Sequence, residues 1–157
     1  ENHKKSNLTF YQKLKNRNEK KLIKNLNKNF LILRIPTYVD EIPKPSTLFD
    51  KIVLSNETGN IQLKGDYSFN QEFILSKDFF NVILELILKR QINRQILNIS
   101  PSRSVNVMEL LNPKFRYSSC PRYYSILDNS KLLSYIKFDF HIPKLSIEDN
   151  RIYWVKS

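Results

Sequence analysis

The sequence has very little glycine, alanine or cysteine. Gly59 and Gly65 are its two glycines, Cys120 is its single cysteine, and alanine is absent from all 157 residues. A dinucleotide-binding turn needs several glycines within a few residues, so that the backbone can approach a pyrophosphate. Neither glycine stands in such a cluster. The sequence given therefore cannot form that turn by itself.

Sulfur ligands and long apolar runs are also scarce. A lone cysteine excludes an intrachain disulfide, and no group of Cys and His has zinc-ligand spacing, so we expect no metal site. The longest apolar run, FFNVILELIL at residues 79–88, is too short to cross a bilayer, and no positively charged leader precedes an apolar segment. These absences favour a cytoplasmic protein that does not enter a membrane.

The chain has a formal charge of +11 and a pI near 9.7. Such a charge is compatible with an anionic partner, including nucleic acid. However, Lys, Asn and Ile are abundant throughout, and the lack of alanine is typical of AT-rich coding rather than of a dedicated basic patch. A nucleic-acid-binding domain therefore remains an alternative that rests on charge alone.

Helical and strand patterns alternate along the chain, which predicts an α/β fold of about one domain. Residues 36–47 contain three prolines and are predicted to be a loop. Strands are expected at 30–35, 61–64, 71–76, 95–100 and 122–127. Helices are expected at 9–29, 48–55, 77–90, 128–136 and 146–157, with a further one capped by Asn106 or Ser104.

Tyr11 and Lys15 stand four residues apart in the first predicted helix, which places them on one face. A tyrosine can act as a base that takes a hydroxyl proton when its phenolate is stabilised. A free tyrosine has a pKa of about 10, and a cation held beside it favours the phenolate. The pair therefore fits such a base, although an interfacial tyrosine beside a solvated lysine would show the same spacing.

The order of several motifs resembles the C-terminal half of the extended short-chain dehydrogenase/reductases, the NAD-dependent epimerase/dehydratase family that acts on nucleotide sugars. YQKLK at 11–15 is similar to the family's Tyr-x-x-x-Lys, and Glu19 matches a Glu common on that helix. LRIPTYV at 33–39 is similar to Leu-Arg-x-x-x-Val-Tyr-Gly-Pro. QEFILSKD at 71–78 is similar to Arg-Asp-Phe-Ile-His-Val-x-Asp, with Asp78 on the last Asp.

Two later segments extend the resemblance over nearly the whole chain. NISPSRSVNVMEL at 98–110 is similar to Asn-Ile-Gly-x-Gly-x-x-Val-Ser-Val-x-Glu-Leu, with Glu109 on the Glu, and DNSKLLSYIKF at 128–138 is similar to Asp-x-Ser-Lys-x-x-x-x-Leu-Gly-Trp. The resemblance implies the C-terminal part of a Rossmann-like fold with its small substrate-binding portion. Residues 1–157 would then form the C-terminal half of an epimerase/dehydratase-type domain, without its N-terminal cofactor-binding part.

The resemblance also implies roles for particular residues. Tyr11 and Lys15 would be catalytic, Lys15 and Pro36 would bind the cofactor, and Thr37 and Gln71 would bind the substrate. The cofactor would be NAD or NADP, although we expect the isolated chain not to bind it. The partners would be a nucleotide-sugar substrate, the missing N-terminal half and, in a homodimer, a second copy.

The chain departs from the family where the family has glycine or arginine. Serines at 100 and 102 replace two glycines, Asn150 replaces another, and Asp40 or Val39 and Phe138 stand at two more. Because glycine positions often need a positive φ, these losses imply altered loops or relaxed constraint. Gln71 replaces an arginine that binds the nucleotide diphosphate, and a neutral amide weakens anion binding. A non-catalytic relic that keeps the fold is therefore the main alternative.

Overall fold

The computed structural model describes residues 10–25, 30–40, 47–60, 69–89, 92–115 and 126–156. The helices are α1 (Phe10–Asn25), α2 (Leu48–Thr58), α3 (Ser76–Leu88) and α4 (Ser130–Leu133), with 3₁₀ turns η1 (Val107–Leu110) and η2 (Pro113–Phe115). The strands are β1 (Leu31–Arg34), β2 (Thr37–Val39), β3 (Asn70–Gln71), β4 (Phe73–Leu75), β5 (Gln95–Asn98), β6 (Val105–Asn106), β7 (His141–Leu145) and β8 (Ile152–Lys156).

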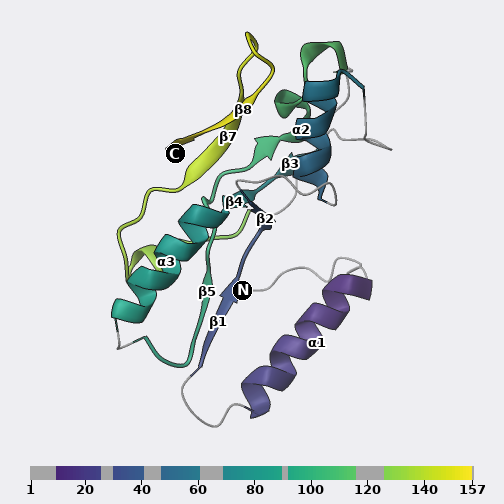
Figure 1. Ribbon diagram of the computed structural model, residues 1–157. Coiled ribbons are helices and arrows are strands. Elements are labelled where there is room, and N and C mark those ends of the chain that lie inside the picture. Colours follow the sequence, from purple (N-terminus) through teal and green to yellow (C-terminus); the bar gives the residue numbers. More distant parts are fainter. Residues whose placement is uncertain are drawn as a thin grey trace.

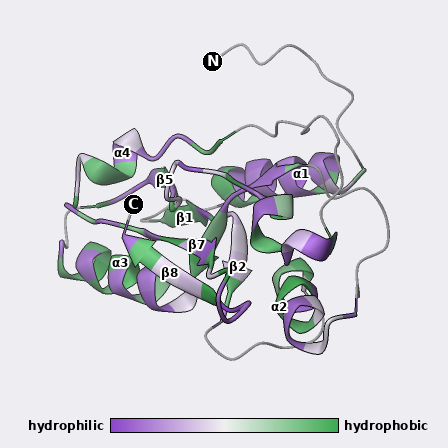
Figure 2. Cartoon of the chain, turned by 90° about the horizontal axis from the view of Figure 1, so that it is seen from above, coloured by the Kyte–Doolittle hydropathy of each residue, from purple (hydrophilic) through white to green (hydrophobic). Residues whose placement is uncertain are grey.

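Strands β1 and β5 form a parallel pair, with Leu31 opposite Gln95 and Arg34 opposite Asn98. FLILRI and QILNI, both expected to be strands, thus lie side by side and run in the same direction. Helices α1 and α3 lie on opposite sides of this pair (Figures 1 and 2). Helices on both sides of a parallel sheet are the arrangement of α/β folds.

A second parallel pair, β2 with β4, connects this layer to a smaller portion of the molecule. That portion contains α2, the antiparallel pair of β3 with β6, and the antiparallel hairpin of β7 with β8 (Figure 1). Helix α2 begins with a capping box, in which the Thr47 side chain accepts from the Asp50 amide and Asp50 accepts from the Thr47 amide. It ends at Gly59, whose φ of 71° is left-handed.

Two hydrophobic cores lie on the two sides of β2 and β4. Tyr38 and Ile74 face the core between β5, α3 and α4, whereas Val39 and Phe73 face the core between α2 and η1. The residues alternate because successive side chains of a strand point to opposite faces. The first core contains Ile74, Val82, Leu86, Leu97, Ile99, Leu132, Ile136 and Phe140, and the second contains Val39, Phe49, Ile52, Phe73, Val107, Met108, Leu110 and Leu111.

The helix predicted at 77–90 is confirmed as α3. Helical spacing places Phe79, Val82, Ile83, Leu86 and Ile87 on one face, and of these Val82 and Leu86 are buried whereas Ile87 is exposed. Three other apolar residues on the same helix, Phe80, Leu84 and Leu88, are also exposed. Helix α3 is therefore apolar on a second side as well, which periodicity alone did not separate from the buried side.

Several predicted elements differ from the structure. Residues 37–39, which were predicted to be part of a loop, form β2. Pro36 does not prevent this strand, because it lies directly before it and removes no hydrogen bond of the ladder. The strand predicted at 71–76 is split at Glu72 into β3 and β4. Residues 126–127 of the strand predicted at 122–127 are not in a strand, and the rest of it lies outside the described residues, as does the strand predicted at 61–64.

The C-terminal prediction was wrong. Residues 146–157 were expected to form a helix, because Ser146 precedes Asp149 in capping-box register, but this segment turns and returns as β8. Ser146 and Asp149 do interact, since the Ser146 side chain lowers the pKa of the Asp149 carboxyl. Their hydrogen bond therefore supports the hairpin turn. The helix predicted at 128–136 is shorter than expected and ends at Leu133, and Asn106 caps only the short η1 turn.

A buried carboxylate holds the hairpin to the rest of the molecule. Asp78 is 1 % exposed, and its two oxygens accept from the His141 backbone amide at 2.6 Å and contact His141 Nδ1 at 2.8 Å. Asp78 is thus not the N-cap of α3, which is Leu75. It lies in the first helical turn and reaches across to the first residue of β7.

We expect Asp78→Ala to lower the free energy of unfolding by roughly 3 kcal/mol, because the backbone amide and the partly buried imidazole of His141 would lose their partner. Urea unfolding followed by Trp154 fluorescence would measure this change. Asp139→Ala is the matched control, since Asp139 is exposed and two residues from His141. Equal losses from both substitutions would contradict the assigned role of Asp78.

Candidate functional site

Tyr11 and Lys15 contact each other on α1, as their spacing predicts. Lys15 Nζ lies over the Tyr11 ring, 5.4 Å from the ring centroid, and Tyr11 is 64 % exposed. A lysine ammonium at this distance from an aromatic face makes a cation–π contact. The pair is therefore preassembled on the surface of the described part of the chain and accessible to another molecule.

Helix α1 carries no buried residue. Its apolar side chains Leu14 and Leu22 are exposed, together with Tyr11. An isolated helix of this length is only marginally stable in water. In a folded protein such a helix gains most of its stability by packing an apolar face against other elements. The exposed side of α1 thus lacks a packing partner among the described residues.

An ion pair ties α1 to the sheet. Arg34, the last residue of β1, donates from Nε to Glu19 Oε2 at 2.9 Å and from Nη2 to Glu19 Oε1 at 2.5 Å. This is the two-bond geometry in which Arg and a carboxylate fit best. The hydrogen bonds and charge of Arg34 lower the pKa of Glu19. The pair holds the helix of Tyr11 and Lys15 beside the carboxyl end of β1.

The sheet edge at β1 is open among the described residues. Strand β1 pairs with β5 on one side, and no described strand pairs with its other side. A parallel sheet is normally buried on both faces and extends over more than two strands. The open edge of β1 and the exposed side of α1 are therefore two surfaces that a further α/β unit would cover.

Thr37 and Gln71 are brought together by the pairing of short strands. Gln71 Nε2 lies 2.9 Å from Thr37 Oγ1 and 3.1 Å from the Glu72 carbonyl oxygen, which also accepts from the Thr37 amide at 3.3 Å. Pro36 directly precedes Thr37 and is half-buried. Within the described residues, no hydrogen bond links this group to Tyr11 or Lys15.

A buried polar network lies behind Gln71, and sequence reasoning did not assign it a role. The Glu72 carboxylate is 5 % exposed and accepts from Ser100 Oγ at 2.5 Å and from the Leu127 amide at 2.9 Å. Asn129 Nδ2 donates to the Ser100 carbonyl at 2.6 Å. The sequence feature that could have indicated this network is Glu72, an acidic residue directly before the apolar strand β4. The network fixes β4 to the segment before α4.

Two non-glycine residues have the left-handed backbone at positions where the resemblance puts glycine. Ser102 has a φ of 50° and Asn150 a φ of 57°. Hydrogen bonds hold both residues, because Ser102 Oγ donates to the Leu127 carbonyl at 2.9 Å and Asn150 Oδ1 accepts from Asn112 Nδ2 at 2.7 Å. At these two positions the glycine conformation is retained, so the expectation of altered loops was wrong there.

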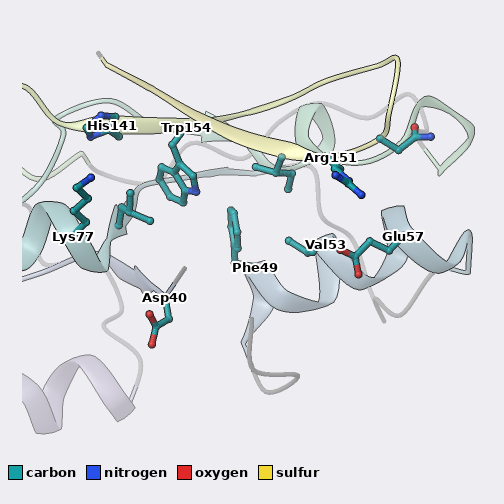
Figure 3. Close-up of a pocket in the computed structure, with 11 residues that line it drawn as sticks. Asp40, Phe49, Val53, Glu57, Lys77, His141, Arg151 and Trp154 are labelled. Carbon is teal, nitrogen blue, oxygen red and sulfur yellow. The ribbon is translucent and has the colours of Figure 1, made fainter. Parts of the chain in front are cut away.

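A cavity of about 520 Å³ lies between α2 and the β7–β8 hairpin. Phe49 and Trp154 pack on each other in its wall, with ring centroids 5.6 Å apart, and Lys77 and His141 lie at one end (Figure 3). Its lining residues are Asp40, Phe49, Val53, Glu57, Leu75, Lys77, His141, Asn150, Arg151, Ile152 and Trp154. None of the site residues predicted from the sequence lines it.

No described helix is both long enough and apolar enough to cross a membrane. No three His, Cys, Asp or Glu side chains in the described ranges gather where they could hold a metal ion.

Comparisons with known proteins found matches among solved structures only. No protein-family model matches the sequence, and no curated protein matches it. The fold is similar to a dTDP-glucose 4,6-dehydratase from Bacillus anthracis solved with NAD, with 16% identity and a TM-score of 0.66. That match covers 92% of this chain and 50% of the dehydratase.

Two epimerases give the same result. A UDP-glucose 4-epimerase from Thermotoga maritima solved with UDP-glucose matches with 17% identity and a TM-score of 0.58, over 88% of this chain and 48% of the epimerase. A UDP-N-acetylglucosamine 4-epimerase from Methanobrevibacter ruminantium solved with UDP-N-acetylmuramic acid matches with 14% identity and a TM-score of 0.57, over 88% and 53%. The chain spans about half the length of these structures, and the predicted resemblance is confirmed at the level of the fold.

The stabilisation of α1 by the Glu19–Arg34 ion pair should depend on pH. Because the folded-state pKa of Glu19 is lowered, its contribution to docking of α1 is present above the ordinary glutamate pKa and is lost as the pH falls through the lower, folded-state value. Both side chains are partly exposed, so we expect this contribution to be about 0.2–1 kcal/mol. An NMR titration from pH 7 to 2.5, reading the Arg34 Nε–H and the α1 amides, would measure it.

Glu19→Gln is the control for this titration. The variant cannot ionise at position 19, so its Arg34 and α1 signals should not follow the wild-type transition. If the variant and the wild type titrate alike below pH 5, another group controls the docking of α1, and the role given to Glu19 would be wrong.

Proposed function

We propose that this chain is the substrate-side half of an NAD(P)-dependent epimerase, dehydratase or reductase that acts on nucleotide sugars. The observation that carries the proposal is the fold match, which covers 88–92% of this chain but about half of the matched dehydratase and epimerases. The contact of Tyr11 with Lys15 supports it, because a phenol and a cation meet on one exposed face.

In such an enzyme, different residues of this chain would have different roles in the reaction. A bound nicotinamide would accept or return a hydride at a sugar carbon. Tyr11 would take the proton of the sugar hydroxyl, and Lys15 would favour the phenolate and hydrogen-bond the cofactor's ribose. Pro36 would lie beside the cofactor, and Thr37 and Gln71 would contact the substrate. The cofactor fits only in part, since Lys15 is exposed and available but the sequence given has no glycine-rich turn for a pyrophosphate.

The proposal therefore requires a partner that supplies this turn. A Rossmann half, from the same polypeptide or from another, would add a parallel strand at the open edge of β1 and cover the exposed side of α1. Both surfaces are unoccupied by described residues, and both carry exposed apolar side chains, Leu31 and Leu22 among them. Residues 1–157 would then be one half of a larger epimerase/dehydratase-type domain in the cytoplasm.

The alternative is a protein that keeps the fold without redox chemistry. Gln71 in place of an arginine favours it, because the amide has no positive charge for a diphosphate. The exposure of Tyr11 is compatible with both functions. Reconstitution with a Rossmann half separates them, since only the enzyme would turn over a nicotinamide cofactor.

In an enzyme reconstituted with the natural upstream half, or with the Rossmann half of the matched dehydratase, we expect Tyr11→Phe to lower turnover by about 10²–10⁴-fold. This is the range typical of a general acid–base group. Lys15→Met should lower turnover and also raise the dissociation constant of the cofactor, because one side chain serves both tasks. NADH absorbance and cofactor titration would measure the two effects.

Lys13→Met is the matched control, since Lys13 lies on the same helix and is exposed but has no tyrosine contact assigned to it. It should change neither turnover nor cofactor affinity. Small and equal effects from all three substitutions would remove the catalytic assignment of Tyr11 and Lys15 and support the fold-keeping alternative.

We expect the isolated chain to show no saturable binding of NAD(H) or NADP(H) below about millimolar cofactor, because one lysine cannot replace a pyrophosphate-binding turn. Isothermal titration calorimetry and nicotinamide fluorescence would test this. Saturable binding at micromolar cofactor would show that the described half contains a cofactor site of its own, and the proposed need for an N-terminal half would be wrong.

A further inference from the structure

The orientation of the Gln71 amide is fixed by its neighbours. The Glu72 carbonyl oxygen can only accept a hydrogen bond, so the group 3.1 Å away must be the Gln71 nitrogen and not its oxygen. The same nitrogen lies 2.9 Å from Thr37 Oγ1. A side-chain amide has two N–H groups, and these two contacts use both.

Gln71 therefore has no donor left for a ligand. Its remaining group is Oε1, which only accepts, and the Thr37 hydroxyl, which accepts from Gln71, can still donate its own proton. An arginine at this position would present several donors and a full positive charge, which match a phosphate. Gln71 instead presents an acceptor oxygen, which suits a hydroxyl or another neutral hydrogen-bond donor of a ligand.

The residues in register with this site do not restore the lost charge. The two hydrogen-bond acceptors of Gln71 are neutral, and so are the residues in register with Thr37 and with β3, namely Phe73, Val105 and Asn106. The carboxylate of the adjacent Glu72 is buried and bonds Ser100 and Leu127 instead.

We propose that the Thr37–Gln71 site takes a neutral, hydroxyl-bearing part of the substrate, such as a sugar ring, and not a diphosphate. This inference rests on the proposed function, because it assumes that Thr37 and Gln71 face the substrate. It deepens that function by naming the group that this site accepts. Any diphosphate in the substrate would be held by other residues.

Inorganic pyrophosphate is the probe for the experiment, and the complete 157-residue chain is the protein. We expect ¹H–¹⁵N NMR titration to show no saturable shift of the Gln71 side-chain amide or the Thr37 backbone amide in the wild type. Gln71→Arg should bind pyrophosphate at least about 10- to 100-fold more tightly than the wild type, the range expected for a charge-assisted hydrogen bond. Thr37→Val, which removes one acceptor and frees one Gln71 N–H, should give a weak, intermediate shift.

Asn70→Arg is the matched control, because it adds the same charge at the neighbouring position of β3, on the other face of the strand. It should behave like the wild type at Thr37. Saturable pyrophosphate binding by the wild type that Gln71→Ala abolishes would overturn the inference, and so would equal binding by the two arginine variants or no gain in Gln71→Arg. Circular dichroism would confirm that each variant is folded.

This binding experiment does not depend on turnover. If the reconstituted protein fails to turn over a nicotinamide cofactor but pyrophosphate binds only to Gln71→Arg, the proposed function is wrong while the neutral character of the site stands. If turnover is found and the wild type binds pyrophosphate through Gln71, the reverse holds.

Discussion

The alternation of side chains along β2 and β4 is the constraint on which both portions of the molecule depend. Tyr38 and Ile74 enter one hydrophobic core, and their neighbours Val39 and Phe73 enter the other. A shift of register by one residue would exchange the two faces and expose both cores at once. The same two short strands carry Thr37 at their beginning and lead into α3 at their end. Thr37 and the buried Asp78 are thus placed by one parallel pair, and Gln71 lies in β3, two residues before β4.

Hydrophobic patterns in the sequence predicted the regular strands and helices that pack in the interior of the fold. FLILRI was predicted as a strand because a continuous apolar run that ends at a proline is typical of a strand covered on both faces, and QILNIS was predicted as a strand from its flanking residues. The predictions failed where short-range signals competed with tertiary contacts. The capping-box register of Ser146 with Asp149 occurs in a hairpin turn, and the return strand is fixed by Trp154 packing on Phe49, a contact 105 residues apart in sequence that no local pattern contains.

Sequence patterns suggested the members of the candidate site, but they did not predict the contacts that these residues make. Spacing identified Tyr11 with Lys15, and order along the chain identified Thr37 with Gln71. No sequence pattern indicated that Gln71 would donate both of its N–H groups within the protein. Nor did the loss of glycine at Ser102 reveal its backbone, because a serine can keep a left-handed φ when its hydroxyl and its neighbours supply enough hydrogen bonds. Substitution of a glycine does not by itself imply a changed loop.

The open edge of β1 has a consequence for the behaviour of the chain on its own. An unpaired strand edge is a template on which another extended segment can add, and exposed Leu31 and Ile35 at its ends make such addition favourable. Natural proteins often guard such edges with lysine and arginine, and the net charge of +11 makes copies of this chain repel each other at low ionic strength. We therefore expect this repulsion to oppose association at the edge of β1 that no described strand pairs, and salt that screens it to favour association there.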